Sequence, residues 1–468
     1  MARSIETNVS ATSTTGIVLT KPVIVLPSGP GYDPEGDFNG GDGADVLRGK
    51  NDNILEIFRG YGGDDQLFGN GGTDWLTGGW GFDLIDGGDG DSDTVIYNDS
   101  PQGVEVNLAT GRGVWGTANG DVILNCEDLV GSNYNDVLIG DAIDNRLHGL
   151  KGDDRLMGGA GADYLEGYEG LDTADYSDSP TAVTVNLATG VGFGGTAEGD
   201  TLKTIEDLIG SAQADTLIGS EDVNELYGGG GDDLLKGAGG ADRLVGVGGN
   251  DTLKGGGGAD TLIGGTGINT ASYYGSPEGV VISLYSHVAE AGDAAGDQLY
   301  NIDNLTGSIH ADQLWGDDWN NVINGEAGAD TLKGYGGADQ LFGSDGDDHL
   351  EGMIGADVLT GGNGADGFVW NATSDTGLTI ATADLITDFN PAQGDRIDLS
   401  NVDANILVAG NQAFTFIGSA GFTGPGQVNF VQVGGETIIQ MQTGQDADVE
   451  GMIRIAGLVT PDASWFLL

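Results

Sequence analysis

The most constraining feature of the sequence is a nine-residue repeat of the form G-G-x-G-x-D-x-U-x, in which U is a large apolar residue. Sixteen units have Gly at the first and fourth positions and Asp at the sixth. The eighth position is Leu, Ile or Phe in fifteen of them and Ala174 in the other. The units begin at Gly40, Gly60, Gly69, Gly78, Gly149, Gly158, Gly167, Gly228, Gly237, Gly246, Gly255, Gly325, Gly334, Gly343, Gly352 and Gly361.

This repeat predicts a coil made of two short strands and two turns. The three residues x-U-x can form only a short strand, whereas the six Gly-rich residues permit turns with positive φ angles that reverse the chain. Two units, or eighteen residues, therefore close one coil with every U residue pointing inward. The predicted fold class is all-β, a parallel β-roll or right-handed β-solenoid.

The sixth-position aspartates form the candidate metal site. Residues eighteen apart stack on one side of the roll at about 4.8 Å, and a Ca²⁺ ion at about 2.4 Å from each oxygen fits between two such carboxylates, with Gly carbonyls completing its ligands. Without metal, the stacked carboxylates would repel one another. We expect roughly eight to twelve Ca²⁺ ions. The predicted ligands are Asp45, Asp65, Asp74, Asp83, Asp154, Asp163, Asp172, Asp233, Asp242, Asp251, Asp260, Asp330, Asp339, Asp348, Asp357 and Asp366.

Some of these aspartates are expected to pair more clearly than others. The pairs predicted first are Asp65 with Asp83, Asp154 with Asp172, Asp233 with Asp251, Asp242 with Asp260, Asp330 with Asp348, Asp339 with Asp357, and Asp348 with Asp366.

Charge narrows the classes of partner. The net charge of −57 argues against nucleic acid or an anionic membrane surface and favours cations. An acidic disordered chain is the alternative, but Leu, Ile and Val recur too regularly for it.

Cys126 is the only cysteine, so no intramolecular disulfide is possible. The apolar stretch Ile17 to Leu26 is interpreted as an opening strand rather than a removable signal, and no apolar run reaches the length of a membrane span.

Three related inserts interrupt the repeats. They open with SPQGVEVNL from Ser100, SPTAVTVNL from Ser179 and SPEGVVISL from Ser276, and each separates flanking repeat positions by 43 residues. The blocks between them span 36, 54 and 54 residues, which are multiples of eighteen. We therefore expect each insert to leave and re-enter the roll on the same side and to continue one solenoid. In the return coils Asn replaces Asp, so we expect them to bind metal weakly or not at all; these residues are Asn145, Asn224 and Asn321.

These patterns divide the chain into nine segments. They are an N-terminal segment (1–39), repeat block 1 (40–95), insert 1 (96–130), repeat block 2 (131–175), insert 2 (176–209), repeat block 3 (210–272), insert 3 (273–306), repeat block 4 (307–369) and a β-rich C-terminal cap (370–468).

The repeats resemble those of RTX, or hemolysin-type, calcium-binding proteins. In addition, GADGFVW from Gly364, DLITDFNPAQGDRIDLS from Asp384 and the final SWFLL resemble the C-terminal region of serralysin-type secreted proteins. The resemblance covers about residues 40–468. It implies Ca²⁺ as cofactor, an extracellular location, and export by type I secretion machinery that reads an uncleaved C-terminal signal.

Enzyme motifs are missing from the sequence. None of the four histidines, which are interpreted as surface residues, begins H-E-x-x-H, and no serine lies in G-x-S-x-G. The segment from Asp89 to Ser100 lacks the Gly and Glu of an EF-hand loop. We therefore expect a secreted, non-catalytic protein that folds on binding extracellular Ca²⁺ and acts in adhesion, matrix or surface association. The alternative is a glycan-binding module or hydrolase with its site in the inserts or the cap, where Trp115, Phe193, Tyr273 and Tyr274 would provide aromatic platforms for extracellular polysaccharide or a cell surface. Strand packing is the favoured role of these four side chains.

Overall fold

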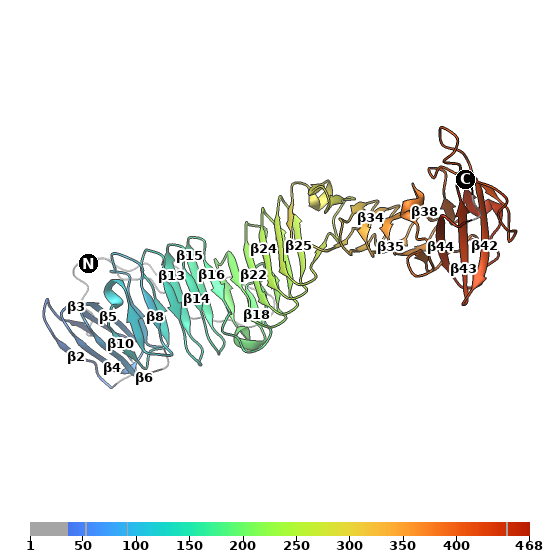
Figure 1. Ribbon diagram of the computed structural model, residues 1–468. Coiled ribbons are helices and arrows are strands. Elements are labelled where there is room, and N and C mark those ends of the chain that lie inside the picture. Colours follow the sequence, from blue (N-terminus) through green and yellow to red (C-terminus); the bar gives the residue numbers. More distant parts are fainter. Residues whose placement is uncertain (1–35, 52–53, 91, 446–447) are drawn as a thin grey trace.

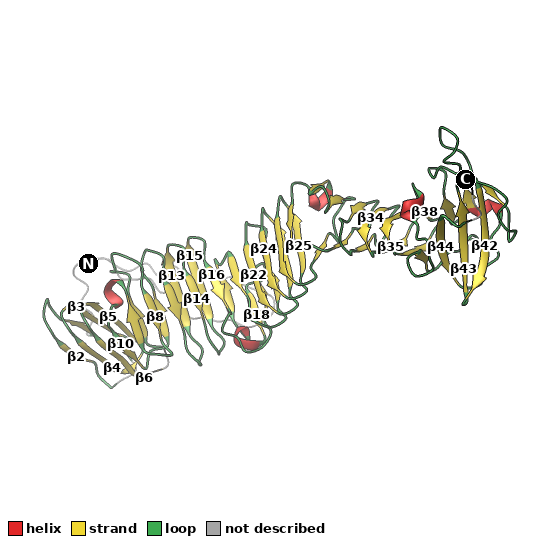
Figure 2. Ribbon diagram, viewed as in Figure 1, coloured by secondary structure: helices red, strands yellow, loops and turns green. Residues whose placement is uncertain are grey.

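The computed structural model describes residues 36–468 except 52–53, 91 and 446–447. The predicted opening strand at Ile17 to Leu26 lies outside these residues. The molecule is elongated, with successive coils stacked along one axis from the N-terminal repeats to the C-terminal cap (Figure 1). Across the described residues, strands and short 3-10 helices make up the regular structure and no α-helix occurs (Figure 2).

Parallel pairing between strands eighteen residues apart builds the roll. For example, Glu225 pairs with Arg243, and Arg243 pairs in turn with Thr261. The prediction of an all-β parallel roll is therefore confirmed. One face is a 23-stranded sheet that continues into the cap. Its strands, in spatial order, are β1 (Asp37–Asn39), β3 (Glu56–Gly62), β5 (Asp74–Trp80), β7 (Thr94–Ile96), β11 (Asp128–Val130), β13 (Arg146–Lys151), β15 (Tyr164–Glu169), β19 (Thr201–Lys203), β18 (Val191–Phe193), β17 (Thr184–Asn186), β21 (Thr216–Ile218), β23 (Leu234–Gly239), β25 (Thr252–Gly257), β27 (Thr270–Ser272), β31 (Asn304–Thr306), β33 (Val322–Asn324), β35 (Gln340–Asp345), β37 (Val358–Asn363), β39 (Asp384–Ile386), β44 (Gly451–Ala456), β43 (Glu436–Gln442), β42 (Gln427–Val433) and β41 (Thr415–Phe416).

The opposite face consists of a 14-stranded and an 8-stranded sheet. The first contains β2 (Val46–Arg48), β4 (Gln66–Gly72), β6 (Leu84–Gly90), β10 (Val122–Leu124), β9 (Arg112–Val114), β8 (Glu105–Asn107), β12 (Val137–Ile139), β14 (Arg155–Met157), β16 (Thr173–Asp175), β20 (Asp207–Ile209), β22 (Glu225–Gly230), β24 (Arg243–Gly248), β26 (Thr261–Thr266) and β30 (Gln298–Tyr300). The second contains β29 (Val288–Glu290), β28 (Val281–Ser283), β32 (Gln313–Trp315), β34 (Thr331–Gly337), β36 (His349–Gly355), β38 (Gly367–Val369), β40 (Arg396–Asp398) and β45 (Phe466–Leu467).

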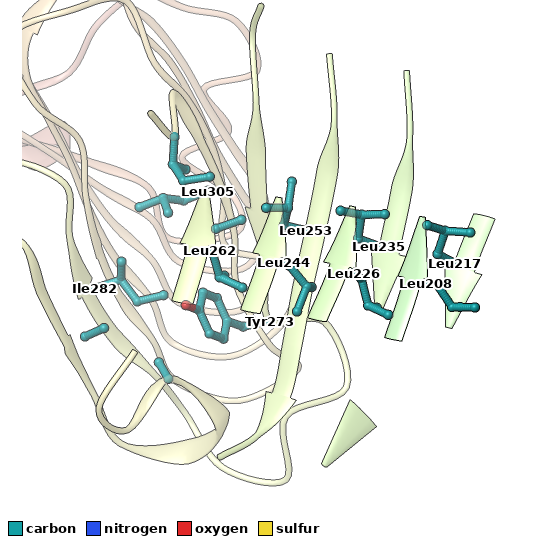
Figure 3. Close-up of a cluster of buried hydrophobic side chains, with 14 of the residues drawn as sticks. Leu208, Leu217, Leu226, Leu235, Leu244, Leu253, Leu262, Tyr273, Ile282 and Leu305 are labelled. Carbon is teal, nitrogen blue, oxygen red and sulfur yellow. The ribbon is translucent and has the colours of Figure 1, made fainter. Parts of the chain in front are cut away.

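The eighth-position residues form the core between the two faces. Leu235, Leu244, Leu253 and Leu262 are fully buried and follow one another along the roll axis (Figure 3). Each coil thus removes two large apolar side chains from water, and burial of one such side chain contributes about 1.5–3 kcal/mol. Because a single coil cannot bury this face alone, the stacking of coils is what stabilises the fold.

Each insert leaves and re-enters the roll on the same side, as predicted. The strand that follows each insert's hairpin pairs in parallel with the strand that precedes the insert: β11 with β7, β20 with β16 and β31 with β27. Each insert adds an antiparallel hairpin and a 3-10 helix. The hairpin β8–β9 extends the 14-stranded sheet, whereas β17–β18 extends the 23-stranded sheet. The helices η1 (Gly116–Ala118), η2 (Gly195–Ala197) and η3 (Gly292–Ala294) consequently lie on alternating sides of the roll (Figure 2).

The C-terminal cap closes the last coil. Strand β44 pairs with β39, and β42 to β44 form an antiparallel sheet. Between the last coil and this sheet, Phe389 contacts both Phe368 and Trp465. The final strand β45 pairs with β40, so the apolar end of the sequence packs on the roll. Two further 3-10 turns, η4 (Thr373–Asp375) and η5 (Ala463–Trp465), belong to this region.

No helix among the described residues is long and apolar enough to span a membrane.

Candidate metal centre

The sixth-position carboxylates form ladders along both edges of the roll. In fifteen of the sixteen, all but Asp45, one carboxylate oxygen, Oδ1, accepts the backbone N–H of a residue one coil earlier. The Asp233 N–H donates to Asp251 Oδ1 at 2.9 Å, and the Asp242 N–H donates to Asp260 Oδ1 at 2.8 Å. All seven pairs predicted first make this contact. The structure therefore brings together the pairs that the repeat length predicts.

The second oxygen, Oδ2, is buried in fourteen of these carboxylates, with no hydrogen-bond donor among the described residues. These fourteen also take part in none of the ion pairs in the described part of the chain. A buried anionic oxygen without a compensating donor or cation is costly, so each position calls for a positive partner. The residues are Asp65, Asp83, Asp154, Asp163, Asp172, Asp233, Asp242, Asp251, Asp260, Asp330, Asp339, Asp348, Asp357 and Asp366.

Burial perturbs the protonation of these carboxyl groups. Desolvation raises the pKa of Asp154 to about 8, with the charges of Asp136 and Asp172 adding to the effect. Desolvation likewise raises the pKa of Asp242 and of Asp339 to about 7. The charged form is thus disfavoured unless a cation compensates it. A hard divalent cation with a preference for oxygen is the partner that fits.

Backbone carbonyls complete the oxygen-rich environment. A Cβ atom at Gly237 would clash with Asp242 Oδ2 and with the Gly255 carbonyl oxygen, so glycine keeps both oxygens accessible. Within the described residues no group of three His, Cys, Asp or Glu side chains forms a metal cluster. Any ion here would therefore be held by two stacked carboxylates together with carbonyl oxygens, which is a donor set that Ca²⁺ accepts.

Asp45 and Asp74 are the two predicted ligands outside this set of fourteen. Asp45 is only partly buried, and its Oδ2 accepts the Gly41 N–H at 2.6 Å. Asp74 lies in the ladder, where its N–H donates to Asp93 Oδ1 at 2.8 Å. Asp45 belongs to the first coil that the structure describes.

The asparagines in the return coils are satisfied without metal. Asn224 Oδ1 accepts the Ser220 N–H at 2.7 Å, and its Nδ2 donates to the Glu206 carbonyl at 2.7 Å. Asn145 and Asn321 repeat the arrangement. An amide therefore satisfies both itself and the carbonyl of the preceding coil, which supports the expectation of weak or absent metal binding at these three positions.

Sequence reasoning missed the carboxylates with which the inserts continue the ladders. Asp200 Oδ1 accepts the Asp163 N–H at 2.8 Å, and Asp200 Oδ2 accepts the Tyr176 hydroxyl at 3.1 Å. The pairs Tyr97–Asp121 and Tyr273–Asp297 are equivalent. A signal was present, because in all three inserts the Tyr lies three residues before the Ser-Pro pair and the Asp lies 21 residues after that Ser. A tyrosine hydroxyl here takes the place that a cation would take elsewhere.

One side-chain prediction is confirmed and one was wrong. Tyr273, for which strand packing is favoured over an aromatic platform, is 1% exposed and points into the core (Figure 3). His148, interpreted as a surface histidine, is 7% exposed, and its Nδ1 lies 3.4 Å from Glu166 Oε2. Both residues occupy strand or strand-end positions whose burial depends on neighbouring coils. Trp115, Phe193 and Tyr274 are exposed, as a platform requires.

Fold and site together define a β-roll repeat protein with ladders of carboxylates suited to a hard cation. The family model described as the RTX calcium-binding nonapeptide repeat matches residues 58–93, 139–174, 204–235, 236–271, 306–341, 315–350 and 333–368. The chain thus carries RTX repeats of the calcium-binding kind over these ranges. No curated protein matches the chain. The matched ranges end before the C-terminal cap, so its likeness to serralysin-type proteins remains a resemblance.

Proposed function

We propose that this chain is a secreted, non-catalytic protein whose β-roll folds when it binds extracellular Ca²⁺, and that the folded roll serves as an extended scaffold in adhesion, matrix or surface association. The observation that supports this proposal best is the set of fourteen buried Oδ2 atoms without a donor in the described chain. Calcium supplies the positive charge that these oxygens need, and the protein supplies the carboxylates and carbonyls.

The free energy of calcium binding is large enough to shift the equilibrium from the unfolded to the folded state. Extracellular calcium modules bind with dissociation constants of roughly 0.1 to 1 mM. At about 1 mM Ca²⁺ each site then contributes about 0.4 to 1.4 kcal/mol. Roughly eight sites would contribute about 3 to 11 kcal/mol, which is comparable to the whole stability of an ordinary domain. Repulsion within a chain of net charge −57 opposes folding until the metal binds.

Export through a type I channel is consistent with folding that depends on calcium. An unfolded acidic chain suits passage through a type I channel, and calcium outside the cell then drives folding. The C-terminal segment that resembles a secretion signal includes Phe466 and Leu468, and both pack at the end of the folded roll. We propose that the secretion machinery reads this segment before the roll folds around it.

Circular dichroism with a chelator and then with added calcium tests the proposal. We expect a largely unfolded spectrum in chelator and a cooperative gain of strand signal as Ca²⁺ is added, with Mg²⁺ much less effective. Mg²⁺ is the matched control because it carries the same charge but demands a smaller, octahedral site. A strand-rich spectrum that chelator leaves unchanged would contradict the proposal.

A further inference from the structure

The three inserts are copies of one module, so each provides a control for the others. At one place insert 3 departs from both of its copies. A cleft of about 380 Å³ lies there, between the insert and the coil that follows it, and is lined in part by Leu284, His287, Asp303, Asp317 and Trp319. In Figure 1 this region lies between β25 and β34.

Two aromatic side chains line this cleft, and two more lie close to its lining residues in the sequence, at positions where the other inserts have no aromatic residue. Trp319, with 76% of its surface exposed, and His287 line the cleft. Tyr285 stacks on Tyr335 beside them, with ring centroids 4.9 Å apart and planes inclined by 7°. The residues equivalent to Tyr285, His287, Trp319 and Tyr335 are Ala109, Gly111, Ile143 and Gly159 in insert 1, and Ala188, Gly190, Asp222 and Ala238 in insert 2.

Backbone strain indicates that the His287 side chain is not needed for folding. His287 has a φ of 54°, in the left-handed region, where Gly111 and Gly190 have φ values of 63° and 66°. A side chain with a Cβ atom is disfavoured in this conformation, because the Cβ atom crowds the backbone. The module folds with glycine in two copies, so the imidazole in the third is explained better by a ligand than by stability.

The cleft also provides hydrogen-bonding groups at its base. Asp317 is fixed there, because its Oδ1 accepts the Trp319 N–H at 2.8 Å. Asp303 is fixed by the Asn269 N–H, which donates to its Oδ2 at 2.8 Å. Carboxylates held in this way can accept hydrogen bonds from hydroxyl groups, while an exposed indole offers a flat apolar face.

We propose that this cleft binds a sugar residue of a neutral polysaccharide. A sugar ring combines an apolar C–H face, which suits Trp319, with hydroxyl groups that suit Asp303 and Asp317. The net charge of −57 excludes acidic polysaccharides as favoured ligands. An organic cation fits less well, because Tyr285 and Tyr335 stack on each other instead of opening as a cage around a cation. The inference deepens the proposed function by naming a class of ligand for the folded scaffold.

Affinity electrophoresis in native gels with saturating Ca²⁺ tests this proposal. The gels contain laminarin, dextran or galactomannan as neutral probes, and dextran sulfate as an acidic control. We expect at least one neutral polysaccharide to retard the parent chain and dextran sulfate to leave it unretarded. Trp319→Ile and His287→Gly install the residues of insert 1, so both variants should fold. Each should weaken retardation about tenfold or more, as loss of a central aromatic contact does.

The matched control is Trp80→Ala, which removes an aromatic side chain of repeat block 1 that is 60% exposed. This variant should bind as the parent does. The inference fails if no neutral polysaccharide retards the parent, if both insert-3 variants bind like the parent, or if free choline but no polysaccharide binds at Trp319 in a fluorescence titration. A calcium titration by circular dichroism on the same variants separates this failure from failure of the proposed function, because folding is measured there without any glycan.

Discussion

At the residue scale, each ladder aspartate has two distinct roles. Its Oδ1 holds the neighbouring coil through a backbone N–H, and its Oδ2 is left for a cation. We predict that Asp242→Ala removes about one to two bound Ca²⁺ ions, because the carboxylate serves ions shared with adjacent coils. Asp178→Ala, an exposed aspartate of insert 2, should remove none. Calcium per chain, measured by equilibrium dialysis, checks both. Equal stoichiometry in the two variants and the parent would refute the assignment.

The tyrosine–aspartate pairs make a second residue-scale prediction. Burial raises the pKa of Asp200 to about 7, and the Tyr176 hydroxyl opposes this rise by hydrogen bonding to the charged form. Tyr176→Phe should therefore cost about 1–3 kcal/mol in saturating calcium, since it leaves a buried carboxylate unsatisfied. The loss should be larger at pH 8 than at pH 5, where Asp200 is protonated. Urea unfolding measures it, with the exposed Tyr274→Phe as control. A loss independent of pH would count against this role.

At the element scale, the turn geometry decides which glycines are required. Gly240 has a φ of 106°, and a Cβ atom there would lie 2.6 Å from the Asp222 carbonyl oxygen. Gly257 has nothing within 4 Å of such an atom. Gly240→Ala should lower the free energy of unfolding by at least about 1 kcal/mol, while Gly257→Ala should be neutral within about 0.5 kcal/mol. Thermal unfolding at fixed calcium compares the two. Equal effects would show that coil spacing, not turn conformation, sets the cost.

At the scale of the whole molecule, the metal-free roll should respond to acid. Burial raises the pKa of Asp233 and of Asp330 to about 7, against about 3.9 in an unfolded chain. At pH values between these two pKa values, the folded state therefore binds more protons than the unfolded state does. Its stability is fully present below about pH 4 and is lost as pH rises through about 7. In chelator, strand content should thus increase as pH falls from 8 to 5.5.

Calcium should reverse this dependence, because protons compete with the metal for the same carboxylates. Calcium affinity should fall as pH is lowered from 8 to 5.5. Circular dichroism at a series of calcium concentrations measures both effects on one sample. Strand content in chelator that rises with pH would show that the ladder carboxyls are not the groups that control folding.

The sequence by itself determined the repeating part of the molecule. A nine-residue period with Leu at one position and Gly at two others permits few structures other than stacked coils, because each coil repeats the same local geometry. For the same reason the repeat length alone placed Asp242 over Asp260. The metal-free character expected of Asn224 also follows from chemistry that the residue type defines, since an amide can donate where a carboxylate cannot.

Only the tertiary structure decided how the chain folds in the three inserts, where the nine-residue repeat is interrupted. The sheet that each insert's hairpin joins depends on how the hairpin pairs with its neighbouring coils, and a length of 43 residues does not specify it. The burial of Tyr273 and its bond to Asp297 link positions 24 residues apart that the nine-residue period does not connect. Likewise, His287 and Trp319 meet at one cleft because insert 3 folds against the next coil. These are contacts between non-equivalent segments, and periodicity contains no information about them.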